Sequence, residues 1–131
     1  MNILIADDHA NVRRGLREII VDEFPGSSFT EAANGNEVLV QLDVSIHDLL
    51  LLDINMPGRN GMDVLKDVKS IYPLLPVVMV SVQPEGQYAS RCLLAGAHAY
   101  INKNYASEDL APAIRKILDR GVAFAKNPLP D

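Results

Sequence analysis

Four consecutive leucines, Leu49 to Leu52, lead directly into Asp53 and constrain the fold of this chain more than any other stretch. An apolar run without alternation is typical of a strand buried on both faces, as in the centre of a parallel sheet. Pro57, Gly58 and Gly61 follow closely and predict an irregular loop. Ligands of open parallel sheets bind beyond the carboxyl ends of the strands. Asp53 is therefore expected at a ligand site, although an aspartate in this place can also simply cap a turn.

Strand-like and helix-like segments alternate along the rest of the chain. Residues that recur at helical spacing, such as Val12, Leu16 and Ile20, predict amphipathic helices between the strands. The predicted strands span 2–6, 28–32, 49–52, 76–81 and 99–103. This alternation predicts an α/β fold, a three-layer sandwich around a parallel sheet. The polar content of the second segment predicts an edge strand.

The C-terminal part is predicted to contain one helix followed by a linker. Ser107 is the predicted N-cap, and Pro112 is expected within about one turn of the helix start. Gly121 is expected to end the helix, and the proline-containing residues beyond it are typical of a linker. We therefore predict one domain over residues 1–121 and a linker or tail over 122–131.

Composition and charge restrict the function further. The 131 residues are sufficient for one domain with its own core, and 48% of them are hydrophobic. A net charge of −5 argues against direct binding of nucleic acid by this chain. The single cysteine, Cys92, excludes an internal disulfide, fits a reducing cytoplasm and is expected in the core. The apolar runs are too short to cross a membrane, and the residues after Met1 lack the pattern of a signal peptide.

Polar and charged side chains follow the predicted strands at the points where the strands end. They are Asp7, Asp8, Asp53, Ser81 and Lys103. In a parallel sheet such side chains converge on one crevice, where the carboxylates form an oxygen-rich site suited to Mg²⁺. With a lysine to hold a phosphoryl oxygen and a serine to donate a hydrogen bond, Asp53 is placed to form an aspartyl phosphate as the nucleophile. Each residue alone has a simpler explanation as a cap or a solvated charge, but the set together favours this chemistry.

Several longer motifs resemble one known family over nearly the whole chain. They are Ile5-Ala6-Asp7-Asp8-His9, Asp53-Ile54-Asn55-Met56-Pro57-Gly58, Asn60-Gly61, Ser81, and Ala95-Gly96-Ala97 with Tyr100 and Lys103. Together they are similar to the receiver domain of bacterial two-component response regulators, most of all the branch that carries a LuxR-type helix-turn-helix. The resemblance implies a flavodoxin-like fold with a five-stranded parallel sheet of order 2-1-3-4-5. It also implies phosphorylation of Asp53 by a sensor histidine kinase.

By the same resemblance, four positions would form a magnesium site. Asp8 and Asp53 would bind Mg²⁺ through their carboxylates, and Asp7 would bind it through water. The backbone carbonyl of Asn55 would be a further ligand. The chain also has histidines without metal-ligand spacing, which we interpret as surface or packing residues: His9, His47 and His98.

The resemblance also assigns the phosphoryl-binding and switch residues. Ser81 and Lys103 would bind the phosphoryl group, and Tyr100 would change rotamer as Ser81 moves. Two positions depart from the family pattern. Asn104 follows the lysine where many members have a proline after a cis peptide, and we expect a trans bond because a non-proline cis bond costs about 2.5–4 kcal/mol. Val82 stands after the serine where a small residue is common, and we expect it to narrow access to the site.

The expected partners follow from the family. A sensor histidine kinase would be the phosphodonor, phosphorylation would favour a homodimer, and DNA would be contacted only through an output domain outside this chain, to which the tail would lead. No membrane partner is expected, and no catalytic turnover beyond slow self-phosphorylation and self-dephosphorylation.

Other functions fit the sequence less well. A phosphatase of the haloacid-dehalogenase type needs a second aspartate two residues after the nucleophile, where Asn55 stands. A nucleotide-binding enzyme would have a glycine-rich loop after the first strand, which this chain lacks. The remaining alternative is a protein-interaction module of the same fold that is never phosphorylated.

Overall fold

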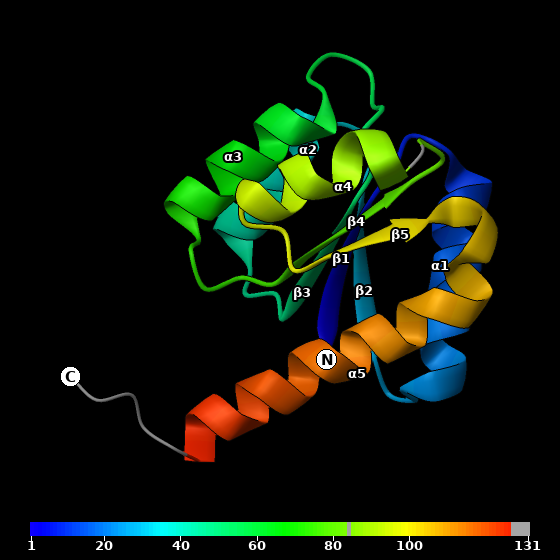
Figure 1. The fold of residues 1–131 in the computed structure, drawn as a ribbon, viewed down its shortest axis with the longest axis vertical. Coiled ribbons are helices and arrows are strands. Elements are labelled where there is room, and N and C mark those ends of the chain that lie inside the picture. The colour runs from blue at the N-terminus through cyan, green and yellow to red at the C-terminus, as the bar shows by residue number, and fades with distance from the viewer. Residues whose placement is uncertain (84, 127–131) are drawn as a thin grey trace.

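The computed structural model describes residues 1–83 and 85–126, which form a parallel sheet covered by helices on both faces (Figure 1). The sheet has five strands in the order β2-β1-β3-β4-β5, as predicted, with β2 at one edge. The strands are β1 (Asn2–Ala6), β2 (Ser28–Ala32), β3 (Leu49–Leu52), β4 (Val77–Ser81) and β5 (Ala99–Asn102). The helices are α1 (Ala10–Glu23), α2 (Gly35–Val44), α3 (Gly61–Ile71), α4 (Glu85–Leu94) and α5 (Ala106–Lys126), with a 3₁₀ turn at Lys103–Tyr105.

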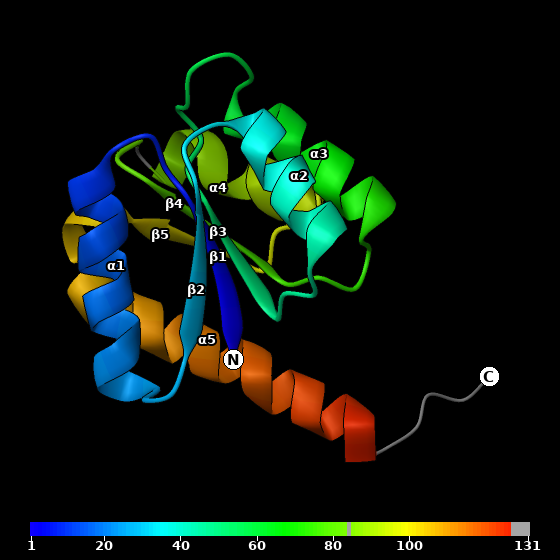
Figure 2. The ribbon, with the colours of Figure 1, turned by 180° about the vertical axis from the view of Figure 1, so that it is seen from behind.

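The two faces of the sheet carry separate hydrophobic cores. Figures 1 and 2 show α2, α3 and α4 on one face and α1 and α5 on the other. Leu50 and Leu52 pack on the first face together with Cys92, whereas Leu49 and Leu51 pack on the second. Each of the four leucines is at most 1% exposed. The leucine run is therefore the doubly buried strand that its sequence predicted.

The start of α5 differs from the prediction. The helix begins at Ala106, so Ser107 lies inside it rather than at its N-cap. The preceding 3₁₀ turn is capped by the Asn102 side chain, whose oxygen accepts a hydrogen bond from the Asn104 N–H at 2.9 Å. Since α5 begins at Ala106, Pro112 lies beyond the first turn of the helix, whereas the sequence predicted it within about one turn of the start.

The end of α5 was also predicted wrongly. The helix runs to Lys126 and does not stop at Gly121. A glycine inside a helix costs about 1 kcal/mol relative to alanine, and good helix formers on both sides offset that cost. Residues 122–126 of the predicted linker are thus helical, and 127–131 lie outside the described residues. None of the described helices, α5 included, is long and apolar enough to cross a membrane.

Candidate functional site

Backbone pairing places two buried carboxylates at the carboxyl edge of the sheet. Ala6 of β1 pairs with Leu52 of β3, so the residues that follow them, Asp7 and Asp53, leave neighbouring strands side by side. The Asp53 N–H donates to the Ala6 carbonyl at 3.0 Å, and the Asp7 N–H donates to the Ala32 carbonyl at 3.0 Å. Asp7 is 1% exposed and Asp53 is 3% exposed. Two carboxylates held together away from water require a cation nearby.

The ammonium group of Lys103 supplies a cation to both acids. Its Nζ lies 2.6 Å from Asp7 Oδ2 and 3.1 Å from Asp53 Oδ2. Burial raises the pKa of the Asp53 carboxyl, and although Lys103 lowers it, the shift remains upward with the help of Asp7. Burial alone would lower the pKa of Lys103, but the close contacts and negative charges of the two carboxylates outweigh it and raise this pKa. Lys103 is therefore a firmly protonated bridge between the two strand ends.

Asp7, Asp8 and His9 form a compact group of side chains of the types that bind metal ions. One ligand atom of each lies within 4.8 Å of the others. Asp7 Oδ2 is buried and is paired with the Lys103 ammonium at 2.6 Å, which leaves Oδ1 on the side of Asp8 and His9. Two neighbouring carboxylates form the oxygen-rich donor set that divalent cations prefer. These residues therefore fit a magnesium ion.

The predicted metal ligands fall into two subsets. Asp7 and Asp8 lie together with His9, while Asp53 is connected to Asp7 through Lys103. Asn55 is exposed, and its backbone N–H donates to Asp53 Oδ1 at 3.3 Å. The His9 side chain is 61% exposed, as a surface residue would be, yet its Nδ1 lies 3.1 Å from an oxygen of each neighbouring aspartate. Sequence reasoning missed this contact, and the signal for it was the position of His9 directly after the acid pair.

The loop after Asp53 is held against the site by a glycine. A Cβ at Gly61 would lie 2.2 Å from the Asp53 carbonyl oxygen and 2.6 Å from the Ile54 Cα, which no side chain can accept. The Gly61 N–H also donates to the Ile54 carbonyl at 2.6 Å. Gly58 has a φ of +85°, a conformation that favours glycine. The predicted loop glycines thus determine where the Asp53 backbone lies.

The ends of β4 and β5 form the other half of the site. Ser81 is fully buried and pairs with Asn102, the residue before Lys103. The Ser81 hydroxyl accepts a hydrogen bond from the Gln83 N–H at 3.1 Å, and the Tyr100 hydroxyl donates to the Gln83 carbonyl at 2.8 Å. Ser81 and Tyr100 are thus linked through one backbone segment.

The two departures from the family pattern both lie in this half. Val82, between Ser81 and Gln83, is 55% exposed. The described residues contain no cis peptide bond, so the bond between Lys103 and Asn104 is trans, as expected.

An arginine of α1 supports the acid half of the site and was not found from the sequence. Arg13 donates from its guanidinium to the Asp7 backbone carbonyl at 2.6 Å and to Glu31 Oε1 at 2.6 Å. Arg17 also pairs with Glu31. Arg13 thereby joins the end of β1 to β2. Both arginines lie in α1, and their contact with Glu31 depends on how this helix packs beside β2.

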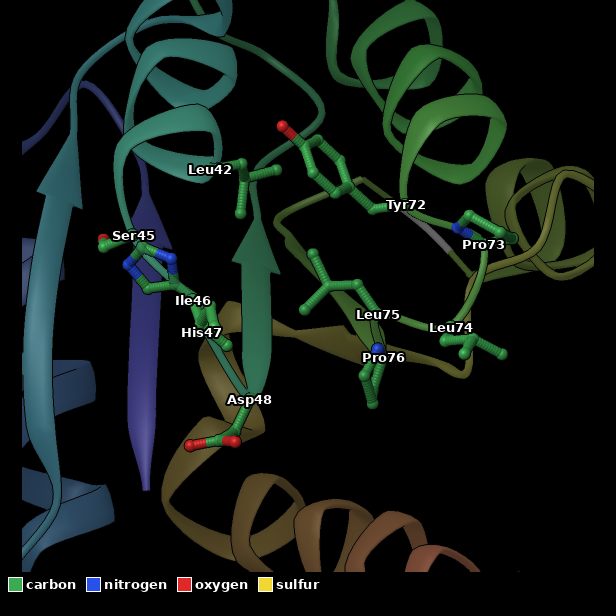
Figure 3. Close-up of a pocket in the computed structure, with 10 residues that line it drawn as sticks. All are labelled: Leu42, Ser45, Ile46, His47, Asp48, Tyr72, Pro73, Leu74, Leu75 and Pro76. Carbon is green, nitrogen blue, oxygen red and sulfur yellow. The ribbon is translucent and has the colours of Figure 1, made fainter.

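A pocket of about 500 Å³ lies elsewhere, at the amino ends of β3 and β4 (Figure 3). It is lined mainly by apolar residues, among them Leu42 of α2 and, in the α3–β4 connection, Tyr72 and Leu75. None of the acids, the lysine or the serine described above lines it. Its volume therefore does not make it the site of the chemistry predicted from the sequence.

The fold and the site together define a flavodoxin-like α/β protein with a buried acid–lysine cluster at the carboxyl edge of its sheet. The chain belongs to the response regulator receiver domain family, whose model matches residues 3–115. It is 36% identical over 121 residues to a glycerol metabolism activator of Pseudomonas putida, covering 92% of this chain and 55% of that protein. It is 33% identical over 122 residues to the chemotaxis protein CheY of Pseudomonas aeruginosa, covering 92% of this chain and 98% of that protein.

Solved structures agree with this assignment. A CheY-like receiver domain protein from Methanospirillum hungatei has a TM-score of 0.81 and 30% identity, covering 91% of this chain and 94% of that chain. A LuxR-family response regulator from Aurantimonas has a TM-score of 0.82 and 25% identity, covering 90% of this chain and 84% of that chain. The family resemblance inferred from the sequence, including relatives of the LuxR type, is confirmed.

Proposed function

We propose that this chain is the phosphoacceptor of a two-component system and that Asp53 receives a phosphoryl group from a sensor histidine kinase. Membership of the receiver family supports the proposal. The observation that carries the proposal is the environment of Asp53. This residue is 3% exposed, and the Lys103 ammonium lies 3.1 Å from its Oδ2. Among the residues that the structure describes, its other oxygen, Oδ1, has a single hydrogen-bond donor, the Asn55 N–H at 3.3 Å, and is left to act as the nucleophile.

The proposed reaction is phosphoryl transfer between a histidine nitrogen and the Asp53 carboxylate. A carboxylate oxygen forms a bond to phosphorus while the nitrogen–phosphorus bond breaks, and the nitrogen keeps the electron pair and takes up a proton from water. Lys103 would bind one phosphoryl oxygen and Ser81 would donate to another. Positioning and charge stabilisation supply most of the rate in such transfers. The product is an acyl phosphate, and turnover is limited to slow self-phosphorylation from small donors and slow hydrolysis.

Several residues would hold a magnesium ion beside Asp53. When bound, Mg²⁺ would offset the negative charge of the transferring phosphoryl group. Asp7, Asp8, Asp53 and the backbone carbonyl of Asn55 would hold it. Asp7 is fixed by the His9 N–H, which donates to its Oδ1 at 2.8 Å, while the Asp8 side chain is 30% exposed and open to a cation from solution.

Phosphorylation would act as a switch through Ser81. A phosphoryl group on Asp53 brings oxygens that accept a hydrogen bond from the Ser81 O–H and draw the hydroxyl toward Asp53. The Gln83 segment that this hydroxyl holds at 3.1 Å is also held by Tyr100 at 2.8 Å, so movement of one residue reaches the other. The surface around Tyr100 and helix α4, which contains Arg91, would change most.

The output is proposed from the relatives. The chain spans 55% of the glycerol metabolism activator and 60% of the transcriptional activator protein ExaE, both of Pseudomonas putida. We therefore propose control of transcription in the cytoplasm, through a DNA-binding domain outside this chain and a homodimer favoured by phosphorylation.

Acetyl phosphate with Mg²⁺ tests the proposal on the protein itself. Intact mass spectrometry should show a single phosphoryl adduct, and amide chemical shifts should change at Tyr100 and along α4. Continuous turnover of the donor would indicate an enzyme, and no adduct would indicate an interaction module. Shift changes confined to the Asp53 loop would contradict the switch.

A further inference from the structure

The peptide group between Asp7 and Asp8 is held by an arginine that lies outside the acid–lysine cluster. Nη1 of Arg13 donates to the Asp7 backbone carbonyl at 2.6 Å. The peptide group before Asp7 is held separately, because the Asp7 N–H donates to the Ala32 carbonyl at 3.0 Å. The Asp7 backbone is therefore fixed on one side by β2 and on the other by α1.

A second contact determines where the Arg13 side chain points. Its Nε donates to Glu31 Oε1 at 2.6 Å, and the other carboxylate oxygen of Glu31 pairs with Arg17. The Arg13 side chain is only 17% exposed, and hydrogen bonds from a charged donor in such a shielded place are strong. Because the guanidinium group is planar and rigid, the bond from Nε to Glu31 also directs Nη1 toward the Asp7 carbonyl.

The orientation of this peptide group determines where Asp8 lies relative to Asp7. The Asp7 side chain is fixed independently, by the His9 N–H at 2.8 Å and by the Lys103 ammonium at 2.6 Å. The Asp8 side chain is 30% exposed, so its position depends mainly on the backbone that carries it. Rotation of the peptide group would therefore move the Asp8 carboxylate while the Asp7 carboxylate stayed in place.

We propose that Arg13 is a positioning residue for the cation site, because it holds the Asp7–Asp8 peptide in the orientation that magnesium binding by Asp8 requires. Residues that orient metal ligands without touching the ion commonly change metal affinity by about 10–100-fold. This role rests on the proposed function, because it concerns the Mg²⁺ of the same site. Its first test uses the metal alone and needs no phosphodonor.

The simpler explanation is that Arg13 only ties α1 to β2. In that case the contact with Glu31 would contribute to stability, and the Mg²⁺ affinity of the folded protein would not depend on the bond to the Asp7 carbonyl. The two roles can be separated because Arg13 makes its two contacts with different nitrogens.

The substitution Arg13→Gln removes one contact and can keep the other. The glutamine amide nitrogen stands at the same place along the side chain as Nε of arginine, so it can still donate to Glu31, but it is too short to reach the Asp7 carbonyl. Glutamine is also a good helix former, so the variant should fold, which urea denaturation checks. Calorimetric titration with MgCl2 should show an affinity about tenfold below that of the wild type.

Two further arginines of α1 provide matched controls. Arg14 is exposed, and Arg14→Gln makes the same change in net charge. Arg17→Gln removes a partner of Glu31 but leaves both contacts of Arg13. Both variants should bind Mg²⁺ as the wild type does. Loss of a positive charge by itself favours binding of a cation, so a weaker affinity in Arg13→Gln cannot result from the change in charge.

A conservative variant and an amide signal report on the bond itself. The ammonium group of Arg13→Lys can still approach the Asp7 carbonyl, so its Mg²⁺ affinity should lie between those of Arg13→Gln and the wild type. The Asp8 N–H belongs to the same peptide group as the Asp7 carbonyl. Its amide nitrogen shift, measured without metal, should therefore change in Arg13→Gln and stay constant in Arg17→Gln.

The rate of phosphorylation by acetyl phosphate distinguishes binding from reaction. Arg13→Gln should be labelled more slowly than the wild type at low Mg²⁺ and at about the wild-type rate at saturating Mg²⁺. Equal Mg²⁺ affinities of Arg13→Gln and Arg14→Gln would overturn the proposed role. So would an equal loss of affinity in Arg17→Gln, or a low rate that saturating Mg²⁺ does not restore.

The proposed role of Arg13 and the proposed function fail separately. An acetyl phosphate adduct on Asp53, together with a wild-type Mg²⁺ affinity in Arg13→Gln, removes the role of Arg13 and leaves the phosphoacceptor intact. A loss of Mg²⁺ affinity specific to Arg13→Gln, in a chain that takes no phosphoryl group, does the reverse.

Discussion

The two halves of the site are held in place by different kinds of interaction. In the acid half, Asp7 and Asp53 follow paired strands, their N–H groups continue the sheet at 3.0 Å, and Gly61 packs directly on the Asp53 carbonyl. In the half formed by β4 and β5, the Ser81 hydroxyl and Tyr100 are joined by two hydrogen bonds to one segment at Gln83. Backbone pairing fixes the acid half, whereas the other half depends on two side-chain hydrogen bonds to one segment. We therefore expect the acid half to stay in place when Asp53 is phosphorylated and the β4–β5 half to move.

Removing the phosphoacceptor should have the largest effect. Asp53→Ala should abolish phosphorylation by acetyl phosphate, because Asp7 is tied to Lys103 and Asp8 faces the cation site rather than the donor. Intact mass spectrometry measures the adduct, with Asp22→Ala on the exposed side of α1 as the control that should be labelled normally. Labelling of Asp53→Ala at the wild-type yield would mean that another residue accepts the phosphoryl group.

The second-largest effect is expected from a substitution that disturbs the packing of the acid half. Gly61→Ala places a Cβ 2.2 Å from the Asp53 carbonyl oxygen, which must move. We expect a loss of about 1–3 kcal/mol in the free energy of unfolding, the usual cost of overpacking, and slower labelling of Asp53. Gly15→Ala is the matched control, because a Cβ there meets nothing within 4 Å. Urea denaturation measures both variants, and equal stability of the two would show that the loop is not clamped.

Weakening the cation site should affect binding more than folding. Asp8→Asn keeps the shape of the side chain and removes one anionic ligand, so the Mg²⁺ affinity should fall by about tenfold or more. The exposed Asp119 on α5 provides the control Asp119→Asn, with the same change in net charge. An Mg²⁺ titration that is unchanged in Asp8→Asn would remove this residue from the ligand set.

Because the pKa of Asp53 is raised, the stability of the folded protein should depend on pH through this residue. Burial is the main cause of the rise above the ordinary value of 3.8, so the native state favours the protonated carboxyl. Protonation of Asp53 therefore adds to the free energy of unfolding. This contribution is complete below pH 3.8 and is lost as the pH rises through the pKa that Asp53 has in the folded state. Asp53→Asn, which stays neutral, should therefore be more stable than the wild type at pH 7, and the difference should shrink as the pH falls toward 4. Urea denaturation of the wild type and of Asp53→Asn at pH 7 and at pH 4 tests this expectation. A difference in stability that does not change with pH would contradict it.

Much of the fold could be predicted because its signals are local. The leucine run at β3 and the alternation of strands and helices are visible in hydrophobic spacing, and the strand order followed from the family resemblance. The limits of α5 were missed because they depend on features that spacing does not show. The helix start depends on the Asn102 cap and a 3₁₀ turn, and the helix continues through Gly121.

The site could be predicted as far as the strand ends determine it. Asp7, Asp53 and Lys103 meet because parallel strands end at one edge, and the sequence shows those ends. The contact of Arg13 with both Asp7 and Glu31 depends on how α1 packs over β2, which no single segment reveals. The His9 ring likewise reaches the two carboxylates only because a turn at Asp7 directs it there.

The smallest effect is expected at Val82, in the half of the site formed by β4 and β5. It follows the buried Ser81, and its 55% exposure places it on the surface that a phosphodonor must cross to reach Asp53. A β-branched side chain is stiff, and attack on phosphorus needs a nearly in-line approach, so modest crowding slows both arrival of the donor and hydrolysis by water. Val82→Ala should speed both reactions about two- to fivefold, a barrier change below about 1 kcal/mol, with the Mg²⁺ affinity unchanged because no metal ligand is altered. Stopped-flow phosphorylation and phosphate release measure the two rates, and equal rates in variant and wild type would show that Val82 points away from the path.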